Sequence, residues 1–155
     1  GKISNPPLGP YSASKFALEA ISEQLAIEAT PFGVKVYVVQ PGIIDTKMAR
    51  DISGGGSSIY PYGRRMAALF QASLQNPVGP QLVAEKICWI VQEEPTSLRH
   101  PVGPDAEPYI EWRRSLSDED WIAWHSADDS TWADQVMNSF GLDVRNTEAL
   151  NDQPA

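Results

Sequence analysis

The sequence predicts an α/β fold in which helices pack against a parallel sheet. An amphipathic pattern from Tyr11 to Thr30 is typical of a helix, and Pro31-Phe32-Gly33 ends it. The β-branched run Val34–Val39 follows and contains one charged residue, so it predicts a mostly buried strand. A helix joined to a buried strand by a tight turn is the second half of a β-α-β unit, so we expect a further strand before Gly1.

The start of the predicted helix carries a candidate pair for proton transfer. The first ten residues hold three prolines and two glycines and predict a loop, with Pro10 suited to the first position of a helix. Tyr11 and Lys15 are four residues apart, so on a helix the phenol and the ammonium share one face. A nearby cation stabilises a phenolate and favours proton exchange near neutral pH. By spacing alone, a tyrosine and a lysine on a solvated helix face are the favoured interpretation, because the spacing is loose and both residue types are common.

The residues after the predicted strand are expected at the edge where such sheets bind ligands. Ligands of parallel sheets lie beyond the carboxyl ends of the strands, which here places Pro41-Gly42-Ile43-Ile44-Asp45-Thr46 at that edge. Pro41 fixes one backbone dihedral, and Gly42 permits close approach of the backbone. Thr46 offers a hydroxyl at the start of a short helix expected to run to Ile52.

Two further helices and one strand are predicted downstream. The Gly/Ser run Ser53–Ser58 is either a linker or a mobile flap over a site, with Tyr60-Pro61-Tyr62 as its aromatic tip. Helices are predicted over Arg64–Gln75 and Gln81–Glu93, and an edge strand over Leu98–Gly103.

The predicted helix Gln81–Glu93 has one apolar side, which we expect to be buried. Its members are Val83, Ile87, Ile90 and Val91, and we interpret Cys88 as a small core residue. His100 lacks a nearby nucleophile or metal-ligand partner in the sequence, which favours a structural role.

Past Asp105 the sequence becomes acidic and rich in tryptophan. Helices are predicted over Pro108–Leu116, over Trp121–Ala127 after a Ser117 cap, and over Asp128–Phe140. The acidic residues around His125 lack a regular metal-ligand spacing, so a solvated acidic face is favoured over a metal site. The tryptophans are expected to dock these helices onto the domain or onto a partner. We expect residues 144–155 to form a disordered tail.

Composition limits the classes of protein. The chain has 155 residues, a formal net charge of −8 and no run long enough to cross a membrane. This acidity argues against a nucleic-acid surface, which needs clustered Lys and Arg. A single cysteine forms no intramolecular disulfide, so no oxidising compartment is required and a cytoplasmic location is expected.

In combination, these motifs resemble the catalytic half of a short-chain dehydrogenase/reductase. The resemblance is carried by GKISNPPLGP, then by YSASKFALEAISEQLAIEATPFGVKVYVVQPGIIDT, and more weakly by the helical region through Glu94 and by PVGPDA. It implies the C-terminal portion of a Rossmann-type doubly wound parallel sheet with extra C-terminal helices. We therefore expect residues 1–105 to be part of an NAD(P)-binding domain and residues 106–143 to be a helical extension.

The resemblance also implies roles for named residues. Tyr11 would be the general acid/base for an alcohol or ketone substrate, and Lys15 would activate Tyr11 and bind the ribose beside the nicotinamide. Pro41, Gly42, Ile43 and Ile44 would line the nicotinamide, with the Ile44 backbone near its carboxamide, and Thr46 would contact the carboxamide or the phosphates. Leu8 and Tyr60 would belong to the loops that cover the substrate. The cofactor would be NAD or NADP.

Parts of the family pattern are missing from these residues. The glycine-rich fingerprint, the catalytic Asn and the catalytic Ser would all lie before Gly1, so the chain is expected to be a fragment that is inactive by itself. A non-catalytic interaction module that keeps half of the fold is the alternative. The apolar loop Pro6-Pro7-Leu8 and Tyr60-Pro61-Tyr62 favour a lipophilic substrate. Homo-oligomerisation of a full-length form through the long helix is expected only by analogy.

Overall fold

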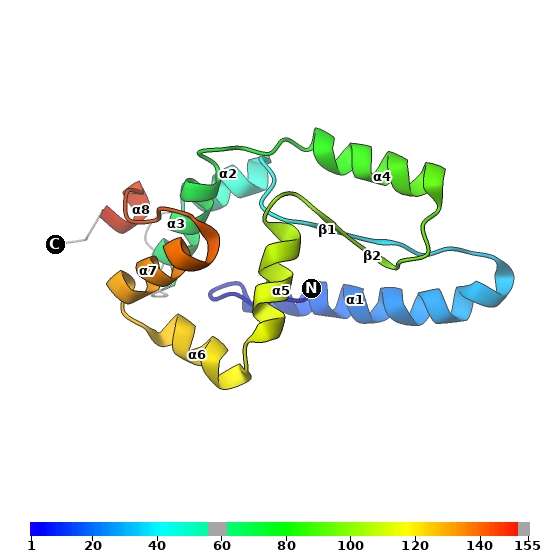
Figure 1. Ribbon diagram of the computed structural model, residues 1–155, viewed down its shortest axis with the longest axis horizontal. Coiled ribbons are helices and arrows are strands. Elements are labelled where there is room, and N and C mark those ends of the chain that lie inside the picture. Colours follow the sequence, from blue (N-terminus) through cyan, green and yellow to red (C-terminus); the bar gives the residue numbers. More distant parts are fainter. Residues whose placement is uncertain (56–61, 152–155) are drawn as a thin grey trace.

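The computed structural model describes residues 1–55 and 62–151 and contains a small parallel sheet and many helices (Figure 1). The elements in chain order are α1 (Gly9–Ala29), a 3-10 turn η1 (Thr30–Phe32), β1 (Val38–Pro41), α2 (Lys47–Ser53), α3 (Gly63–Ser73), α4 (Gln81–Glu93), β2 (Arg99–Val102), α5 (Ala106–Ser115), α6 (Asp118–Ser126), α7 (Asp129–Phe140) and α8 (Glu148–Asn151). The α/β class predicted from the sequence, a partial doubly wound fold with extra C-terminal helices, is confirmed.

The sheet consists of β1 and β2, which pair in parallel, with Val38 opposite Arg99 and Pro41 opposite Val102. In Figure 1 the two strands lie between α4 and the long α1. The strand β1 is shorter than the predicted run Val34–Val39 and ends two residues later. Strand geometry requires a hydrogen-bonded neighbour, and the pairing with β2 covers only these four residues.

Side-chain caps determine where several helices begin. The Thr46 hydroxyl accepts a hydrogen bond from the Ala49 N–H at 3.2 Å and starts α2. Ser117 and Asp120 form a reciprocal capping box at α6, and the Asp128 carboxylate caps α7. Gly141 ends α7 in a left-handed conformation that glycine adopts without strain. These local signals explain why the predicted helix boundaries agree with the structure to within about two residues.

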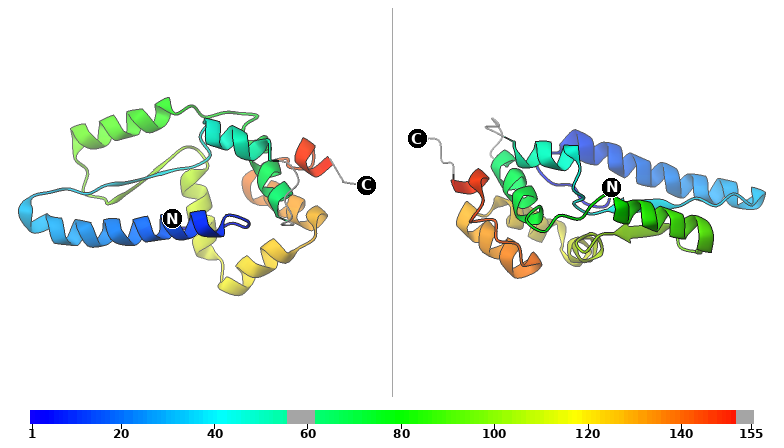
Figure 2. Two further views of the ribbon diagram at one scale, coloured as in Figure 1. Left: turned by 180° about the vertical axis from the view of Figure 1, so that it is seen from behind. Right: turned by 90° about the horizontal axis from the view of Figure 1, so that it is seen from above.

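The main cluster of buried side chains lies among the C-terminal helices and α3. It contains Ala68, Ala72, Trp132, Ala133, Val136 and Val144, with Leu69, Trp124 and Phe140 packed against it. Figure 2 shows α3, α7 and α8 together at the end of the molecule away from α4. Trp132, Ala133 and Val136 of α7 share this cluster with the small alanines Ala68 and Ala72 of α3. The predicted boundary at residue 105 therefore separates α3 in sequence from the helices on which it packs.

Much of the apolar surface of α1 and α4 is exposed. On α1 the exposed side chains include Phe16, Leu18, Ile21, Leu25 and Ile27. On α4 only Ile90 is buried, so the prediction that Ile87 and Val91 face a core is wrong. Cys88 is exposed as well, which corrects its interpretation as a core residue. A two-stranded sheet offers too little surface to cover both helices, and this is the physical reason for the difference.

The C-terminal residues differ from the predicted disordered tail. Val144 is 1% exposed and belongs to the main core cluster, and Glu148–Asn151 form α8. The Ala149 N–H also donates to the Gln71 side chain of α3 at 3.0 Å. The polar composition concealed this packing, which also involves Leu142, Ala149 and Leu150 against the same cluster. Residues 152–155 of the predicted tail lie outside the described residues.

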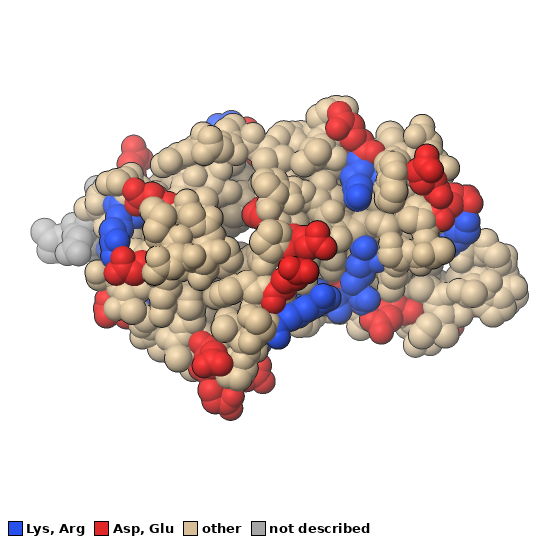
Figure 3. Space-filling model, viewed as in Figure 1, with Lys and Arg blue, Asp and Glu red and all other residues tan. Residues whose placement is uncertain are grey.

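Charges on the molecular surface are mixed in sign. On the face shown in Figure 3, basic side chains lie mostly beside acidic ones. Examples are the ion pairs Arg99–Glu23, Arg113–Asp118 and Arg145–Asp134. Among the helices described, none is long and apolar enough to cross a membrane.

Candidate active site

Tyr11 and Lys15 lie together near the start of α1. The Lys15 ammonium is 5.4 Å from the centre of the Tyr11 ring. Tyr11 is 46% exposed, so this residue is open to a ligand at the start of the helix. Their proximity follows from the four-residue spacing on a helix, since Cβ atoms at these positions are neighbours along one face. The structure thus brings together Tyr11, the predicted proton donor and acceptor, and Lys15, the residue predicted to activate it.

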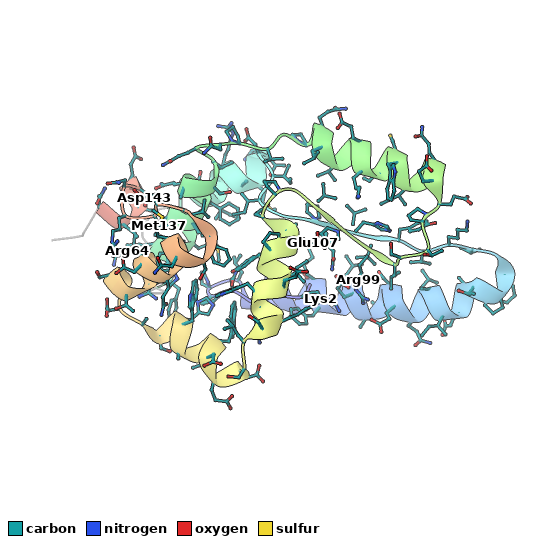
Figure 4. All side chains as sticks on the ribbon, viewed as in Figure 1. Lys2, Arg64, Arg99, Glu107, Met137 and Asp143 are labelled. Carbon is teal, nitrogen blue, oxygen red and sulfur yellow. The ribbon has the colours of Figure 1, made fainter. Side chains whose placement is uncertain are left out.

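A buried carboxylate attaches α1 to the sheet. Glu19 is 4% exposed and lies on the same helix, eight residues after Tyr11. The Gln40 side-chain amide donates to Glu19 Oε1 at 2.6 Å, and Arg99 Nε donates to Glu19 Oε2 at 2.8 Å. Arg99 also donates to Glu23 at 2.6 Å. Figure 4 shows Arg99 between β2 and α1, with Lys2 nearby. One side chain of α1 therefore contacts both strands.

The Glu19 network favours the charged carboxylate. Burial by itself disfavours the ionised form, but the hydrogen bonds from Arg99 and Gln40 outweigh this effect, and the net result is a lowered pKa of Glu19. Because Gln40 directly precedes Pro41, the ionised Glu19 couples the position of α1 to the turn that follows β1. Together with the bond from Arg99 to Glu23, this contact restrains the helix that carries Tyr11 and Lys15.

The turn after β1 is held by contacts to three other segments. The Gly42 N–H donates to the Val102 carbonyl at 2.9 Å, and the Asp45 N–H donates to the Val78 carbonyl at 2.8 Å. The Ile43 N–H donates to the Asp105 carboxylate at 2.7 Å. For the Ile44 N–H, the part of the chain that the structure describes provides no acceptor. Among the described residues, the Ile44 N–H and the Thr46 N–H are thus both available to a ligand, while the Ile44 side chain is buried and anchors the turn.

The two ends of this turn differ in exposure. Pro41 is exposed at the end of β1, whereas Thr46 is half-buried at the start of α2. The Thr46 oxygen accepts the Ala49 N–H, which leaves its hydroxyl proton free to be donated to a ligand. Arg50 makes two hydrogen bonds of 2.7 Å to Asp45 and fixes the start of α2 relative to the turn. The five predicted residues Pro41, Gly42, Ile43, Ile44 and Thr46 therefore occupy one short segment.

The residues predicted to cover a substrate are only partly described. Leu8 is half-buried, and its carbonyl accepts the Ser12 N–H at 2.8 Å in the first turn of α1. Tyr60, Pro61 and residues 56–58 of the Gly/Ser run lie outside the described residues, so the predicted flap stays a prediction. Tyr62 is described and begins α3.

An aromatic pocket lies beside the loop that precedes Tyr11. It is lined by Pro6, Tyr62, Met66, Leu69, Tyr109 and Trp132, with Asn5 and His125 among its polar members. The Tyr109 hydroxyl donates to Asn5 at 3.0 Å, and burial raises the pKa of Tyr109 to about 12. Burial, together with Arg65 and Arg113, lowers the pKa of His125 to about 4, so this imidazole is neutral at pH 7. The pocket is therefore uncharged and mostly apolar apart from the Arg65 edge.

Sequence reasoning did not identify two residues that shape the site. The amphipathic pattern of Tyr11–Thr30 did not single out Glu19, yet this residue is buried and paired. The acidic residue of PVGPDA, Asp105, reaches back 62 positions to Ile43. A charged residue on the inner face of a helix is a signal that could have identified Glu19. Nothing in the local sequence predicts the contact of Asp105.

The donors at the start of α1 and in the turn after β1 are of the kinds that suit the nicotinamide half of a dinucleotide. An ammonium and hydroxyls match ribose hydroxyls, and a free backbone N–H matches a carboxamide oxygen. Lys15, Thr46 and Ile44 would hold these groups. In the described ranges, no group of three or more His, Cys, Asp or Glu side chains is placed to hold a metal ion.

Comparisons with known proteins indicate the family of this chain. Residues 1–55, which include Tyr11, Lys15 and the turn after β1, match the family model described as short chain dehydrogenase. The chain is 30% identical over 128 residues to an uncharacterised oxidoreductase of Schizosaccharomyces pombe, covering 81% of this chain and 54% of that protein. It is 29% identical over 134 residues to the uncharacterised oxidoreductase YusZ of Bacillus subtilis, covering 81% of this chain and 47% of YusZ.

A relative with a more specific name is the 3-ketodihydrosphingosine reductase of Bacteroides thetaiotaomicron. It is 34% identical over 109 residues, which cover 67% of this chain and 40% of that enzyme. No solved structure matches the chain. The chain spans about half the length of the curated relatives it matches. It belongs to the short-chain dehydrogenase/reductase family of oxidoreductases.

Proposed function

We propose that this chain supplies the proton-transfer part of an NAD(P)-dependent oxidoreductase that interconverts an alcohol and a ketone. The observation that carries the proposal is the pairing of Tyr11 with Lys15 on a helix that Glu19 fastens to the strand leading into the cofactor turn. Proton exchange at an oxygen needs a positioned acid/base within reach of the substrate. Exposed at the start of α1, the Tyr11 hydroxyl meets the requirement of access.

Tyr11 acts as the general acid/base. In reduction its hydroxyl gives a proton to the carbonyl oxygen, and in oxidation its phenolate takes the proton from the alcohol. The Lys15 ammonium stabilises the phenolate by charge and binds the ribose hydroxyls. A bound nicotinamide supplies or accepts the hydride. The Ile44 N–H and the Thr46 hydroxyl hold its carboxamide side, while Pro41, Gly42 and Ile43 line it.

A lipophilic substrate is the class that this chain favours. The pocket beside the opening loop is built mainly from apolar and aromatic side chains, including Pro6 and Tyr62. The relative from Bacteroides thetaiotaomicron is named for a ketone substrate, 3-ketodihydrosphingosine. By similarity, we propose that the substrate of this chain is also a lipophilic ketone. Leu8 and Tyr60 would belong to the loops that cover it.

The 155 residues alone are expected to be inactive and to bind cofactor weakly. Their described strands form a two-stranded sheet, so the adenosine half of a dinucleotide meets little of the sheet edge that it needs. A protein of the relatives' length that contains these residues is expected to turn over, and its exposed α1 surface is expected to form a homo-oligomer contact.

The test is the absorbance of NADH or NADPH at 340 nm in the presence of lipophilic ketones and alcohols. A protein of the relatives' length should show turnover with one cofactor, and the 155-residue chain should not. Turnover by the short chain would contradict its predicted inactivity. Absence of both turnover and cofactor binding in the longer protein would favour the alternative, a non-catalytic interaction module.

A further inference from the structure

Asp105 occupies a helix cap position but does not cap its helix. It precedes α5 and makes no side-chain hydrogen bond to that helix. Aspartate at this position ordinarily accepts a backbone N–H of the first helical turn. Here one carboxylate oxygen instead accepts the N–H of Ile43 at 2.7 Å, across 62 residues of sequence. A hydrogen bond to a charged acceptor is stronger than a neutral one, so this contact restrains the turn after β1.

Two glycines lie so close to the Asp105 carboxylate that a side chain on either would contact it. A Cβ on Gly42 would lie 1.9 Å from Asp105 Oδ1, which is far inside van der Waals contact. A Cβ on Gly103 would lie 3.0 Å from the same oxygen, and Gly103 also has a φ of +104°. Gly42 is not among the described residues with positive φ, so its requirement for glycine comes from the space that Asp105 fills. The backbone and the carboxylate thus form one packed unit.

The contact has a consequence for the donors of the turn. Within the turn, the N–H groups of Gly42, Ile43 and Asp45 are all bonded inside the chain, and that of Ile43 is bonded only because Asp105 is present. The intervening Ile44 N–H has no acceptor among the residues described. Because the N–H groups of Ile43 and Asp45 are bonded on either side, the direction of the Ile44 N–H is fixed. Preorganised donors bind a ligand more tightly because less entropy is lost.

We propose that Asp105 is a positioning residue that holds the Pro41–Thr46 turn through the Ile43 N–H and keeps the Ile44 N–H free for the nicotinamide carboxamide. The inference rests on the proposed function, because the ligand of the Ile44 N–H is taken from it. Asp105 itself does not touch the cofactor. Its loss should weaken recognition of the nicotinamide half and leave the adenosine half unaffected.

The experiment measures dissociation constants of NADH, NADPH and ADP-ribose for a protein of the relatives' length that contains these residues. Asp105→Ala should raise the dissociation constant of the preferred dinucleotide about tenfold, the ratio that corresponds to one lost hydrogen bond, while that of ADP-ribose changes less than twofold. Asp105→Asn keeps an oxygen acceptor, so its dissociation constant for the dinucleotide should lie between those of the unmodified protein and of Asp105→Ala. The matched control is Glu107→Ala, because Glu107 is an exposed acidic residue two positions further along α5 (Figure 4), and it should change neither constant.

A second variant pair tests the contact from the other side. Gly42→Ala should weaken dinucleotide binding about as much as Asp105→Ala, because its methyl group displaces the carboxylate. In the Asp105→Ala background the methyl group has room. Adding Gly42→Ala there should raise the dissociation constant of the dinucleotide by less than a further twofold. Amide hydrogen exchange at Ile43 should be faster in Asp105→Ala than in the unmodified protein, whether or not cofactor is added.

The outcomes separate this inference from the proposed function. An unmodified protein that binds neither dinucleotide overturns the proposed function and the inference with it. Unmodified binding together with unchanged binding by Asp105→Ala overturns only the role of Asp105. Equal weakening of the dinucleotide and of ADP-ribose would show a general structural effect and would also overturn it. If Asp105→Ala does not fold, the Asp105→Asn and Gly42→Ala variants replace it. Additive rather than coupled effects of these two substitutions on the dissociation constant of the dinucleotide would overturn the role of Asp105.

Discussion

The molecule contains two regions that are stabilised in different ways. The helical region, defined as α3 and α5–α8, buries its own apolar side chains around Trp132, Val136 and Val144. The sheet region, defined as α1, β1, β2 and α4, leaves much of its apolar surface exposed and is joined by polar contacts centred on Glu19. The proposed active site belongs to the sheet region. Its geometry therefore depends more on hydrogen bonds and less on packing.

This difference has a physical origin in the two architectures. Short helices rich in alanine and tryptophan can bury one another without further elements. Helices beside a parallel sheet need several strands to cover their apolar faces. The side chains of α1 are thus suited to a larger sheet than the described two strands provide. The relatives, which are longer than this chain and about half covered by it, are consistent with that need.

The largest expected effect is in the core of the helical region. Replacement of Trp132 by alanine should lower the free energy of unfolding by about 3–5 kcal/mol, because it removes a 3% exposed side chain and leaves a cavity. Urea unfolding followed by circular dichroism measures the change. A loss below about 1 kcal/mol would show that this core does not stabilise the chain.

Removing the charge of Glu19 should have the next largest effect, of about 2 kcal/mol at pH 7, the value of a hydrogen bond to a charged group. The pKa of Glu19 is lowered in the folded state, so its contribution is complete above the unfolded value of 4.5 and is lost as the pH falls through the folded pKa. Glu19→Gln should therefore be less stable at pH 7 and show a weaker dependence on pH below about 4.5. Identical acid profiles of the two proteins would contradict this role.

The helical region should respond to acid in a different pH range. The pKa of His125 is lowered from 6.5 to about 4 in the folded state, mainly by burial and further by Arg65 and Arg113. As the pH falls from 6.5 to about 4, His125 binds a proton in the unfolded chain but stays neutral in the folded chain. The free energy of unfolding therefore decreases over this range. His125→Gln should remove this decrease. Chemical denaturation at pH 7, 5.5 and 4.5 measures it, and an unchanged slope would contradict the shift.

The smallest effect is expected on the exposed face of α1. Leu25 is 49% exposed, so Leu25→Ala should change the free energy of unfolding of this chain by less than about 0.5 kcal/mol. Alanine also favours the helix, which offsets part of the lost contact. Thermal unfolding of the two chains measures the difference. A loss comparable to that of Trp132→Ala would remove the distinction between the two regions.

Much of the fold could be predicted because its signals are local. Prolines and glycines mark the ends of α1 and α4, and the bounds of α4 agree with the prediction at both ends. Burial was predicted less well. Ile87, Cys88 and Val91 look like a core face in sequence, but burial depends on what packs against a face, and the described sheet does not reach them.

The site shows the same division between local and distant information. The four-residue spacing of Tyr11 and Lys15 was enough to predict their proximity, and strand polarity was enough to place Pro41–Thr46 in one turn. The contacts of Glu19 with Arg99 and of Asp105 with Ile43 span 80 and 62 residues. Such pairs are set by the tertiary fold, and no periodicity in the sequence encodes them.

The proton-transfer role of Tyr11 is tested most directly by comparing Tyr11→Phe with the unmodified protein in a chain of the relatives' length. The measurement is steady-state turnover at 340 nm together with the dissociation constant of the cofactor. Loss of the hydroxyl should reduce turnover by about a hundredfold or more, as expected for removal of a general acid/base, and change cofactor binding less than about threefold. Turnover within threefold of the unmodified enzyme would contradict the role of Tyr11.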